Sequence, residues 1–384
     1  MHDFSHTTPA LRLHQGAQAL QQLGLELDRL GCTRAVVLCG ASLARDTPSM
    51  ERVRAALGPR CAGIAPLVRA HSPLPEVQEA ARSLQQLQAD AVIALGGGSA
   101  IVTARAASIL LAEAEPAAQL CTLRDAHGHL HSPRLQAPKL PQFVIPTTPT
   151  TAIVKAGSAM LNPADGARMA LFDPKTRARA VFIDPALLAT PPRELVVSAS
   201  LNTLAMAIEG LCSTRGDPMA DAYLMHALRL IVEHLPALAD GDSADARAQL
   251  MMASILCGHG TDYTGAGIAI PLGHALSARF HVDNGLANAI VMPHVLRFNA
   301  PAAQPGLQKM GRALNLAPTL DALLDALQAL SRQLQLPTQL RQLGVTRDAL
   351  GALAEVCMDD WFVRDNPRRV HHAAELETLL SHAW

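Results

Sequence analysis

The sequence lacks several features that mark particular classes of protein. Its 384 residues include 32 Lys and Arg against 33 Asp and Glu, and they contain no long basic run. Because nucleic acids and anionic membranes attract clustered positive charge, neither is expected as a partner. No apolar run is long enough to cross a bilayer, and residues 1–16 lack the basic and apolar segments of a signal peptide.

Cysteine pairs are also missing, because the seven cysteines are scattered and none forms a CxxC motif. An odd, scattered set in a long chain indicates reduced thiols in a reducing compartment, so the protein is predicted to be cytoplasmic. Repeats and low-complexity tracts are absent as well. Hydrophobic residues at 49% and charged residues at 17% are typical of an ordinary globular protein, and the length favours two domains.

The first half of the chain alternates short apolar runs with amphipathic helical patterns. Strands are expected at 34–40, 60–68, 90–95, 141–150 and 179–185, with helices at 16–31, 50–58, 75–89 and 100–115. Buried runs separated by helices predict a doubly wound parallel sheet. Long helical patterns follow at 193–213, 220–240, 244–260 and 320–336. We therefore expect an α/β domain over 1–186 and an all-helical domain over 187–384.

The strongest local signal is "DAVIALGGGSAIVTARAA", in which an apolar run enters Gly96, Gly97, Gly98 and Ser99 before a helical pattern. Glycines let a backbone lie against a ligand, and the positive end of the following helix suits a pyrophosphate. The alternative is a tight turn that Ser99 caps. The segment "VIPTTPTTA" then places Thr147, Thr148, Thr150 and Thr151 after a strand, where doubly wound sheets bind ligands. A hydrogen-bonded threonine turn is the alternative there.

Two groups of histidines raise the question of a metal. His274, His281 and His294 lie within one apolar, glycine-containing stretch. The segment "DAHGHLHSP" places His127, His129 and His131 at alternate positions, which is typical of a metal-binding tract but more often of a solvated loop.

Several stretches together resemble the iron-containing alcohol dehydrogenase family, and the resemblance covers nearly the whole chain. They are the GGGS turn, the PTT segment, "VFIDPALL", "LNTLAMAIEGLCS", "NGLANAIVMPHVLRFNAPA" and "DNPRR". The resemblance implies an N-terminal dinucleotide-binding domain, a C-terminal helical domain and a homodimer, in a dehydroquinate synthase-like fold. The stretches "LGPRCAGIAPLVRAHSPLPEV" and "LCGHG…GIAIPLGHAL" are most similar to the maleylacetate reductase branch.

The resemblance places the family's metal ligands, an Asp and three His, at Asn202, Met206, Ile270 and Asn284. Fe²⁺ and Zn²⁺ bind imidazole, carboxylate or thiolate, whereas Ile270 has no donor and the others are weak or soft. The sequence therefore predicts no metal, and His281 and His294 do not fall on ligand positions. His274 aligns with a family histidine near the nicotinamide that is associated with proton transfer. Its alternative is a hydrogen-bonded core histidine.

The family's nucleotide motifs are also altered. GGGSxxDxAK corresponds to 96–105, where Val102 replaces the Asp and Arg105 the Lys; PTTxGTGSE loses its glycines and its Ser-Glu pair, with Thr150, Ala152, Ile153 and Val154 in their places. Gly40 stands where NAD-preferring relatives carry an Asp, so either NAD or NADP is expected. The predicted cofactor-binding residues are Gly40, Gly96, Gly97, Gly98, Ser99, Thr147, Thr148, Thr151 and Arg168.

The favoured function is a metal-independent, NAD(P)H-dependent oxidoreductase that reduces a small carbonyl compound or oxoacid. His274 would donate the proton, Asn202 and Asn284 would stabilise the developing alkoxide, and Arg279 or Arg368 would hold a substrate carboxylate. The alternative is a catalytically inactive nucleotide-binding homologue, which the altered motif positions would also fit. A zinc-dependent lyase or cyclase such as dehydroquinate synthase ranks third, because the zinc ligands are missing.

Overall fold

A computed structural model describes residues 3–113, 115–125, 130–164 and 166–384. The chain folds into two compact units. The α/β unit comprises Pro9–Thr148 and Ala152–Pro191, and the helical unit comprises Met1–Thr8, Pro149–Thr151 and Pro192–Trp384. The chain thus leaves the α/β unit for three residues within the "PTTPTTA" segment.

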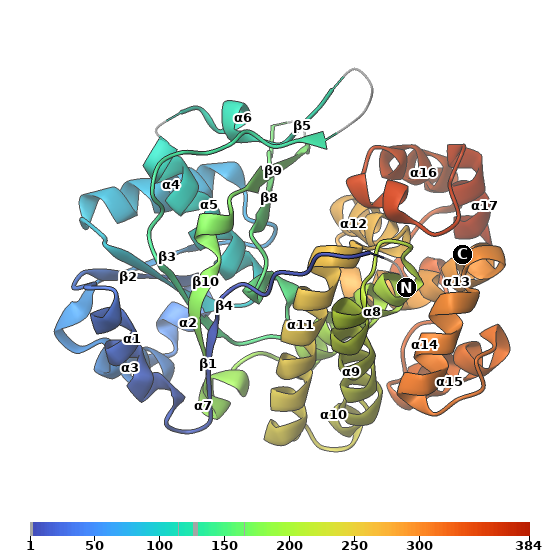
Figure 1. Cartoon of the computed structure of the whole chain (residues 1–384), viewed down its shortest axis with the longest axis horizontal. Coiled ribbons are helices and arrows are strands. Elements are labelled where there is room, and N and C mark those ends of the chain that lie inside the picture. The colour runs from blue at the N-terminus through green and yellow to red at the C-terminus, as the bar shows by residue number, and fades with distance from the viewer. Residues whose placement is uncertain (1–2, 114, 126–129, 165) are drawn as a thin grey trace. The chain divides into compact units, whose positions relative to one another are not determined.

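The α/β unit contains a six-stranded parallel sheet with the strand order β1-β10-β7-β4-β2-β3 (Figure 1). Strands β2, β4 and β7 are buried along almost their whole length because helices cover both faces of a parallel sheet. The strands are β1 (Arg12–Gln15), β2 (Ala35–Gly40), β3 (Cys61–Val68), β4 (Ala91–Gly96), β7 (Gln142–Pro146) and β10 (Ala178–Ile183).

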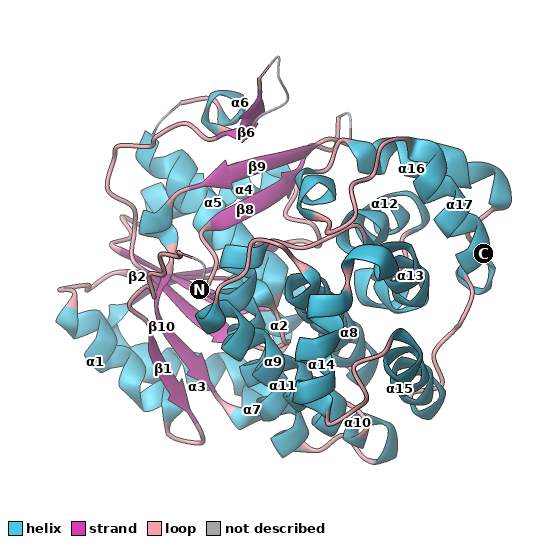
Figure 2. Ribbon diagram, turned by 45° about the vertical axis from the view of Figure 1, so that its right-hand side comes forward, coloured by secondary structure: helices cyan, strands magenta, loops and turns pink. Residues whose placement is uncertain are grey.

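Helices cover both faces of this sheet, as a doubly wound fold requires. Leu23, Leu27 and Val53 from α1 and α3 pack on one face against Ile93 and Phe143, while α4 and α5 contact β3 and β4 from the other (Figure 2). The helices are α1 (Gln22–Arg29), α2 (Ala41–Arg45), α3 (Thr47–Leu57), α4 (Leu74–Gln86), α5 (Gly98–Glu113), α6 (Ala117–Leu120) and α7 (Pro185–Leu188).

Some strands of the α/β unit escaped the sequence patterns. Strand β1 joins the sheet edge parallel to β10 although its four residues are mostly exposed and form no apolar run. Two antiparallel pairs also form, β5 (Leu123–Arg124) with β6 (Leu130–His131) and β8 (Gly157–Leu161) with β9 (Arg168–Phe172). His131 lies in β6, whereas His127 and His129 lie outside the described residues.

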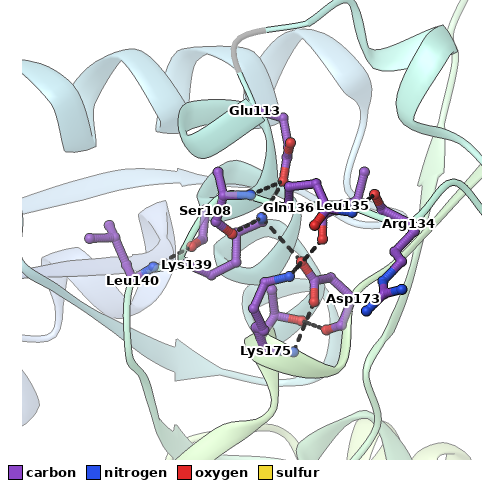
Figure 3. Close-up of polar contacts among 11 residues, drawn as sticks. Ser108, Glu113, Arg134, Leu135, Gln136, Lys139, Leu140, Asp173 and Lys175 are labelled. Carbon is purple, nitrogen blue, oxygen red and sulfur yellow. Dashed lines mark hydrogen bonds and ion pairs between the residues drawn. The ribbon is translucent and has the colours of Figure 1, made fainter.

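A buried ion cluster ties three segments of the α/β unit together (Figure 3). The fully buried Lys139 ammonium lies 2.5 Å from Glu113 Oε1 at the end of α5 and 3.1 Å from Asp173 Oδ2 after β9. Lys139 also donates to the carbonyl of Ala137 at 2.6 Å. The Lys139 contact holds the pKa of Glu113 below its usual value. Each charge in the cluster therefore has an opposite charge beside it.

The helical unit is built from long helices around one apolar core. Pro236 divides the expected 220–240 helix, because proline lacks the N–H that continues a helix. The helices are α8 (Arg193–Cys212), α9 (Pro218–His234), α10 (Ala237–Asp240), α11 (Ala244–Thr264), α12 (Ala269–Phe280), α13 (Asn284–Asn299), α14 (Gln304–Leu314), α15 (Leu320–Gln333), α16 (Leu350–Met358) and α17 (Ala373–Ala383). The predicted fold class, a parallel α/β domain followed by an all-helical domain, is confirmed.

Helix α8 is the single described helix that is long and apolar enough to span a membrane. Within its most apolar window, 83% of the residues are buried inside the protein. Its composition is that of the central core helix of the helical unit, as the clustering of Leu201, Leu204 and Ile208 with residues of the surrounding helices shows.

Candidate functional site

The glycine turn lies at the carboxyl end of β4. Strand β4 ends at Gly96, whose φ of +139° is a conformation that residues with a side chain rarely adopt. Helix α5 begins at Gly98, so Ser99 lies inside its first turn and does not cap it as one alternative expected. The first N–H groups of a helix have no acceptor within it, and they carry its positive end. The turn therefore presents backbone donors suited to an anion.

Thr147 and Thr148 lie directly beside this turn. The Thr147 N–H donates to the carbonyl of Gly96 at 3.0 Å, and a Cβ atom added to Gly97 would lie 2.5 Å from the Thr148 hydroxyl. Gly97 is therefore needed for the close approach of the two segments. The α/β unit brings together six of the predicted cofactor residues, Gly96–Ser99 and Thr147–Thr148.

The strand order places the turn at a switch point of the sheet. From β2 the chain moves outward to β3, then crosses back to β4 on the other side of β2. Ligands of open parallel sheets bind beyond the carboxyl ends of the strands where the order reverses. Gly40 and Gly96 are the last residues of β2 and β4.

Ser72 supports the turn from behind, and sequence analysis missed it. Its hydroxyl donates to the Ser99 carbonyl at 3.1 Å and accepts from Thr103 Oγ1 at 3.0 Å, while its own carbonyl accepts from the Leu161 N–H. Ser72 has a φ of +48°, which is strained for a residue with a side chain. Arg168, one of the predicted cofactor residues, pairs with Leu161 across β8 and β9. It therefore lies on the strand beside the one that contacts Ser72.

Arg105, which is expected to correspond to the family's Lys, holds two backbone segments together. Its side chain is fully buried in α5 and donates to the carbonyls of Ala152 at 2.7 Å and Gly157 at 2.5 Å. These two hydrogen bonds hold the backbone at the end of the "PTTPTTA" segment and at the start of β8. A guanidinium spans two carbonyls more readily than an ammonium because its donors are arranged in a planar fork.

In the helical unit, Asn202 and Met206 belong to a neutral hydrogen-bonded network. They lie four residues apart on one face of α8. Asn202 Oδ1 accepts from Asn288 Nδ2 at 2.9 Å. The Met206 sulfur accepts from Thr151 Oγ1 at 3.5 Å and lies 3.9 Å from Asn202 Nδ2. The carbonyl oxygen of Asn202, its only metal donor, thus already accepts one hydrogen bond from an amide.

The other two expected ligand positions differ from each other. Ile270 is 2% exposed within the apolar core, whereas Asn284 is the first residue of α13 and its buried Oδ1 accepts no hydrogen bond from the described residues. Gly273 permits the approach of α12 to α13, because a Cβ atom there would lie 2.0 Å from Asn288 Oδ1. Among the residues that the structure describes, no three His, Cys, Asp or Glu side chains gather to hold a metal ion.

A buried carboxylate fixes the start of α12. Glu209 Oε2 and Oε1 accept from the N–H groups of Gly267 and Ala269 at 2.8 and 2.6 Å. Burial raises the pKa of Glu209 to about 7, although these hydrogen bonds oppose the shift. The carboxylate thereby holds in place the helix that carries His274.

His274 has an acidic neighbour that the sequence did not reveal. Its Nδ1 lies 3.6 Å from Asp360 Oδ2, and both side chains are largely buried. Asp360 Oδ1 accepts from the Phe362 N–H at 3.0 Å, which fixes the carboxyl group. Nδ1 thus faces a carboxylate beyond hydrogen-bond distance, and Nε2 lies on the opposite edge of the ring.

Several other candidates lie away from this network. His281 has a left-handed backbone at the end of α12, and Arg279 is exposed with its guanidinium 5.9 Å from the Phe280 ring. Arg368 donates to the Phe298 carbonyl at 3.0 Å. Phe298 and Asn284 are separated along α13 by about 20 Å at the helical rise. That Arg279 or Arg368 holds a substrate carboxylate stays a prediction.

Comparisons with known proteins agree with the resemblance. Residues 10–185 match the iron-containing alcohol dehydrogenase family and residues 196–384 match the C-terminal part of the same family. A maleylacetate reductase from Burkholderia cepacia is 28% identical over 96% of this chain and 94% of its own length. An NAD-dependent methanol dehydrogenase from Bacillus methanolicus is 26% identical over 92% and 93%.

Solved structures share the fold. The crystal structure of sulfoacetaldehyde reductase from Bifidobacterium kashiwanohense in complex with NAD⁺ matches with a TM-score of 0.87 and 20% identity, over 100% of this chain and 99% of the other. The two sequence matches together cover almost the full length, on both sides of the boundary near residue 190. The chain therefore belongs to the iron-containing alcohol dehydrogenase family.

Proposed function

We propose that the chain is a metal-independent, NAD(P)H-dependent reductase of a small carbonyl compound or oxoacid, in the manner of the maleylacetate reductases among its relatives. One observation carries this proposal. The four positions expected to correspond to the family's metal ligands hold two amides, a thioether and an aliphatic side chain, and Asn202 accepts a hydrogen bond from Asn288. An iron or zinc ion at these positions would find a thioether and two neutral amides, which are poor ligands for it.

The α/β unit fits a dinucleotide. Gly96 to Ser99 offer backbone N–H groups and the positive end of α5 to the diphosphate, and the hydroxyls of Thr147 and Thr148 stand beside them. A bound nicotinamide, when reduced, supplies the hydride. Gly40 carries no carboxylate that would repel a 2′-phosphate, so both NADH and NADPH are expected to bind.

The helical unit supplies the proton and the neutral donors. Asp360 orients the imidazole of His274, so that Nε2 donates the proton to the carbonyl oxygen as it becomes a hydroxyl. The amide of Asn284, with the second N–H of Asn202, stabilises the developing negative charge on that oxygen. These neutral groups take the part that a Lewis acid plays in metal-dependent relatives.

The test uses protein treated with EDTA and passed through a desalting column. NADH or NADPH oxidation is followed at 340 nm with a panel of aldehydes and oxoacids that includes maleylacetate. Turnover without metal, unchanged by added Zn²⁺ or Fe²⁺, is the expected result. Turnover that appears only after metal is added contradicts the proposal. His274→Gln should lower kcat about 100-fold or more and flatten its pH profile, while Asp360→Asn should lower kcat less.

A second candidate is a nucleotide-binding homologue without catalysis. It is favoured by the number of altered motif positions, including Val102, Thr150 and Ala152. Calorimetric titration with NADH separates the two candidates, because binding without turnover on any panel substrate supports the second. The family resemblance also predicts a homodimer, which light scattering of the purified protein tests.

A further inference from the structure

A pocket of about 410 Å³ lies in the helical unit between the C-terminal half of α13 and α17. Its size is within the range of pockets that hold small ligands. The charged and aromatic side chains that line it are His294, Arg297, Phe298, Arg368, Glu375 and His382. His294 follows Asn284 by about 15 Å along α13 at the helical rise, so the pocket is distinct from the Asn202 network.

The pocket has an excess of positive charge. Glu375 is the one acidic residue in the lining of the pocket, and its carboxylate already accepts hydrogen bonds. It accepts from the Arg368 guanidinium at 3.3 Å and from the N–H groups of His371 and His372 at the start of α17, at 2.8 and 3.4 Å. The exposed Arg297 makes one long contact of 3.4 Å, with the Pro293 carbonyl.

The pKa of His294 is affected by the positive charge around the pocket. Burial, together with the neighbouring Arg297 and His382, lowers the pKa of His294 to about 4. His294 is therefore neutral at pH 7, and its ring lies 6.5 Å from that of His382. The Arg368 guanidinium lies 3.9 Å over the Phe298 ring, a cation–π contact that holds it in position.

We propose that this pocket binds a small organic oxyanion, a carboxylate or a phosphate, between Arg297 and Arg368. Guanidinium groups hold such oxyanions through paired, charge-assisted hydrogen bonds. Arg368 is already oriented by the Phe298 ring and carbonyl, whereas Arg297 is free to turn toward the ligand. The two imidazoles add neutral donors, and the buried Leu379 provides an apolar surface for the carbon part of the ligand.

Anion binding has a measurable consequence for His294. A negative charge beside the ring favours its protonated form, so the bound anion raises the pKa of His294 above about 4. The groups that face His294 are Arg297 on its own helix, His382 and Glu375 on α17, and Arg368 on the preceding segment. Because none of them belongs to the reductase site, the result does not depend on turnover.

The experiment uses the full-length protein labelled with ¹³C-histidine. Succinate and inorganic phosphate are titrated in separate samples, and the His294 signal, assigned with His294→Gln, is followed by NMR from pH 3.5 to 7. A saturable shift with a raised His294 pKa is expected for at least one probe, and the probe that binds identifies a carboxylate or a phosphate ligand. The absence of a saturable shift with both probes overturns the proposal.

Two arginine variants test whether the anion binds in this pocket or is attracted by the general positive charge of the surface. Arg297→Gln should weaken binding about tenfold or more, because it removes charge-assisted hydrogen bonds. Arg369→Gln, which changes an exposed arginine in the segment that carries Arg368, should leave the affinity unchanged. Equal weakening by both variants contradicts the proposal. Melting curves of both variants establish that the fold is intact.

Discussion

The two units each contain a buried polar network, and the networks are of opposite kinds. In the α/β unit, Lys139 is enclosed by the carboxylates of Glu113 and Asp173. In the helical unit, Asn202, Asn288 and Met206 are joined by neutral hydrogen bonds alone. The Lys139 charge is stabilised by opposite charges beside it, whereas neutral amides are satisfied by hydrogen bonds alone. The first network is therefore fixed in composition, and the second tolerates replacement of its members.

The same contrast separates the two candidate binding regions. The turn at Gly96–Ser99 is made of backbone groups, which persist as long as the glycines and the helix start persist. The network around Asn202 is made of side chains, so exchange of a few residues changes its chemistry completely. The family match covers both halves of the chain, although the positions expected for its metal ligands hold neutral residues. A backbone site that persists and a side-chain site that changes would give this result.

The largest expected effect tests the charged network. Lys139→Met should lower the free energy of unfolding by about 3–5 kcal/mol, because it removes the fully buried cation from between Asp173 and the partly buried Glu113. Lys175→Met removes a 40% exposed ammonium 3.2 Å from the same Asp173 and should cost less than about 1 kcal/mol. Urea unfolding followed by circular dichroism measures both. If Lys139→Met lowered the free energy of unfolding no more than Lys175→Met does, the buried cluster would not depend on its cation.

Glu209 is the buried carboxylate of the helical unit. Glu209→Gln should cost about 1–3 kcal/mol, because the amide presents an N–H to one of the two backbone donors. Burial raises the pKa of Glu209 from 4.5 to about 7. The native state therefore keeps the proton that the unfolded state releases, and the stability contributed by Glu209 falls as the pH rises through this interval.

Urea unfolding at pH 4.5 and pH 7 should therefore show part of this fall in the wild type and not in Glu209→Gln. Glu194→Gln, which changes an exposed residue in the first turn of α8, is the matched control and should change stability by less than about 0.5 kcal/mol. A pH slope that persists unchanged in Glu209→Gln would assign it to another group.

Gly97 tests the backbone site. Gly97→Ala places a methyl group 2.5 Å from the Thr148 hydroxyl, so NADH affinity measured by fluorescence titration should fall about tenfold. Adding Thr148→Ala removes that hydroxyl and should recover part of the loss. Gly157→Ala, where a Cβ atom meets nothing within 4 Å, should leave affinity unchanged. Equal affinities for Gly97→Ala and the wild type would exclude this turn from the cofactor site.

The smallest effect tests the neutral network. Met206→Leu keeps the volume but removes the sulfur that accepts from Thr151, so a loss of about 0.5–1.5 kcal/mol is expected. Met292→Leu, at a buried position in the same unit, provides the comparison and should cost less. A loss above about 3 kcal/mol for Met206→Leu would show that the network depends on its members as strongly as the charged cluster does.

The amino-acid sequence was enough to predict five of the six strands of the parallel sheet, the glycine turn and the helical second half. These features follow from apolar periodicity and from glycine, which act over a few residues. Strand β1 had no such signal, because a mostly exposed edge strand needs no apolar run.

Only the tertiary structure decided which distant side chains meet. Asn288 reaches Asn202 and Asp360 reaches His274 across long separations in sequence, and no local pattern marks either partner. Ser72 behind the glycine turn is a further example. Such pairs arise from how helices and strands pack, where a glycine such as Gly273 sets the closeness of approach. Packing depends on the whole unit, and therefore no short stretch encodes it.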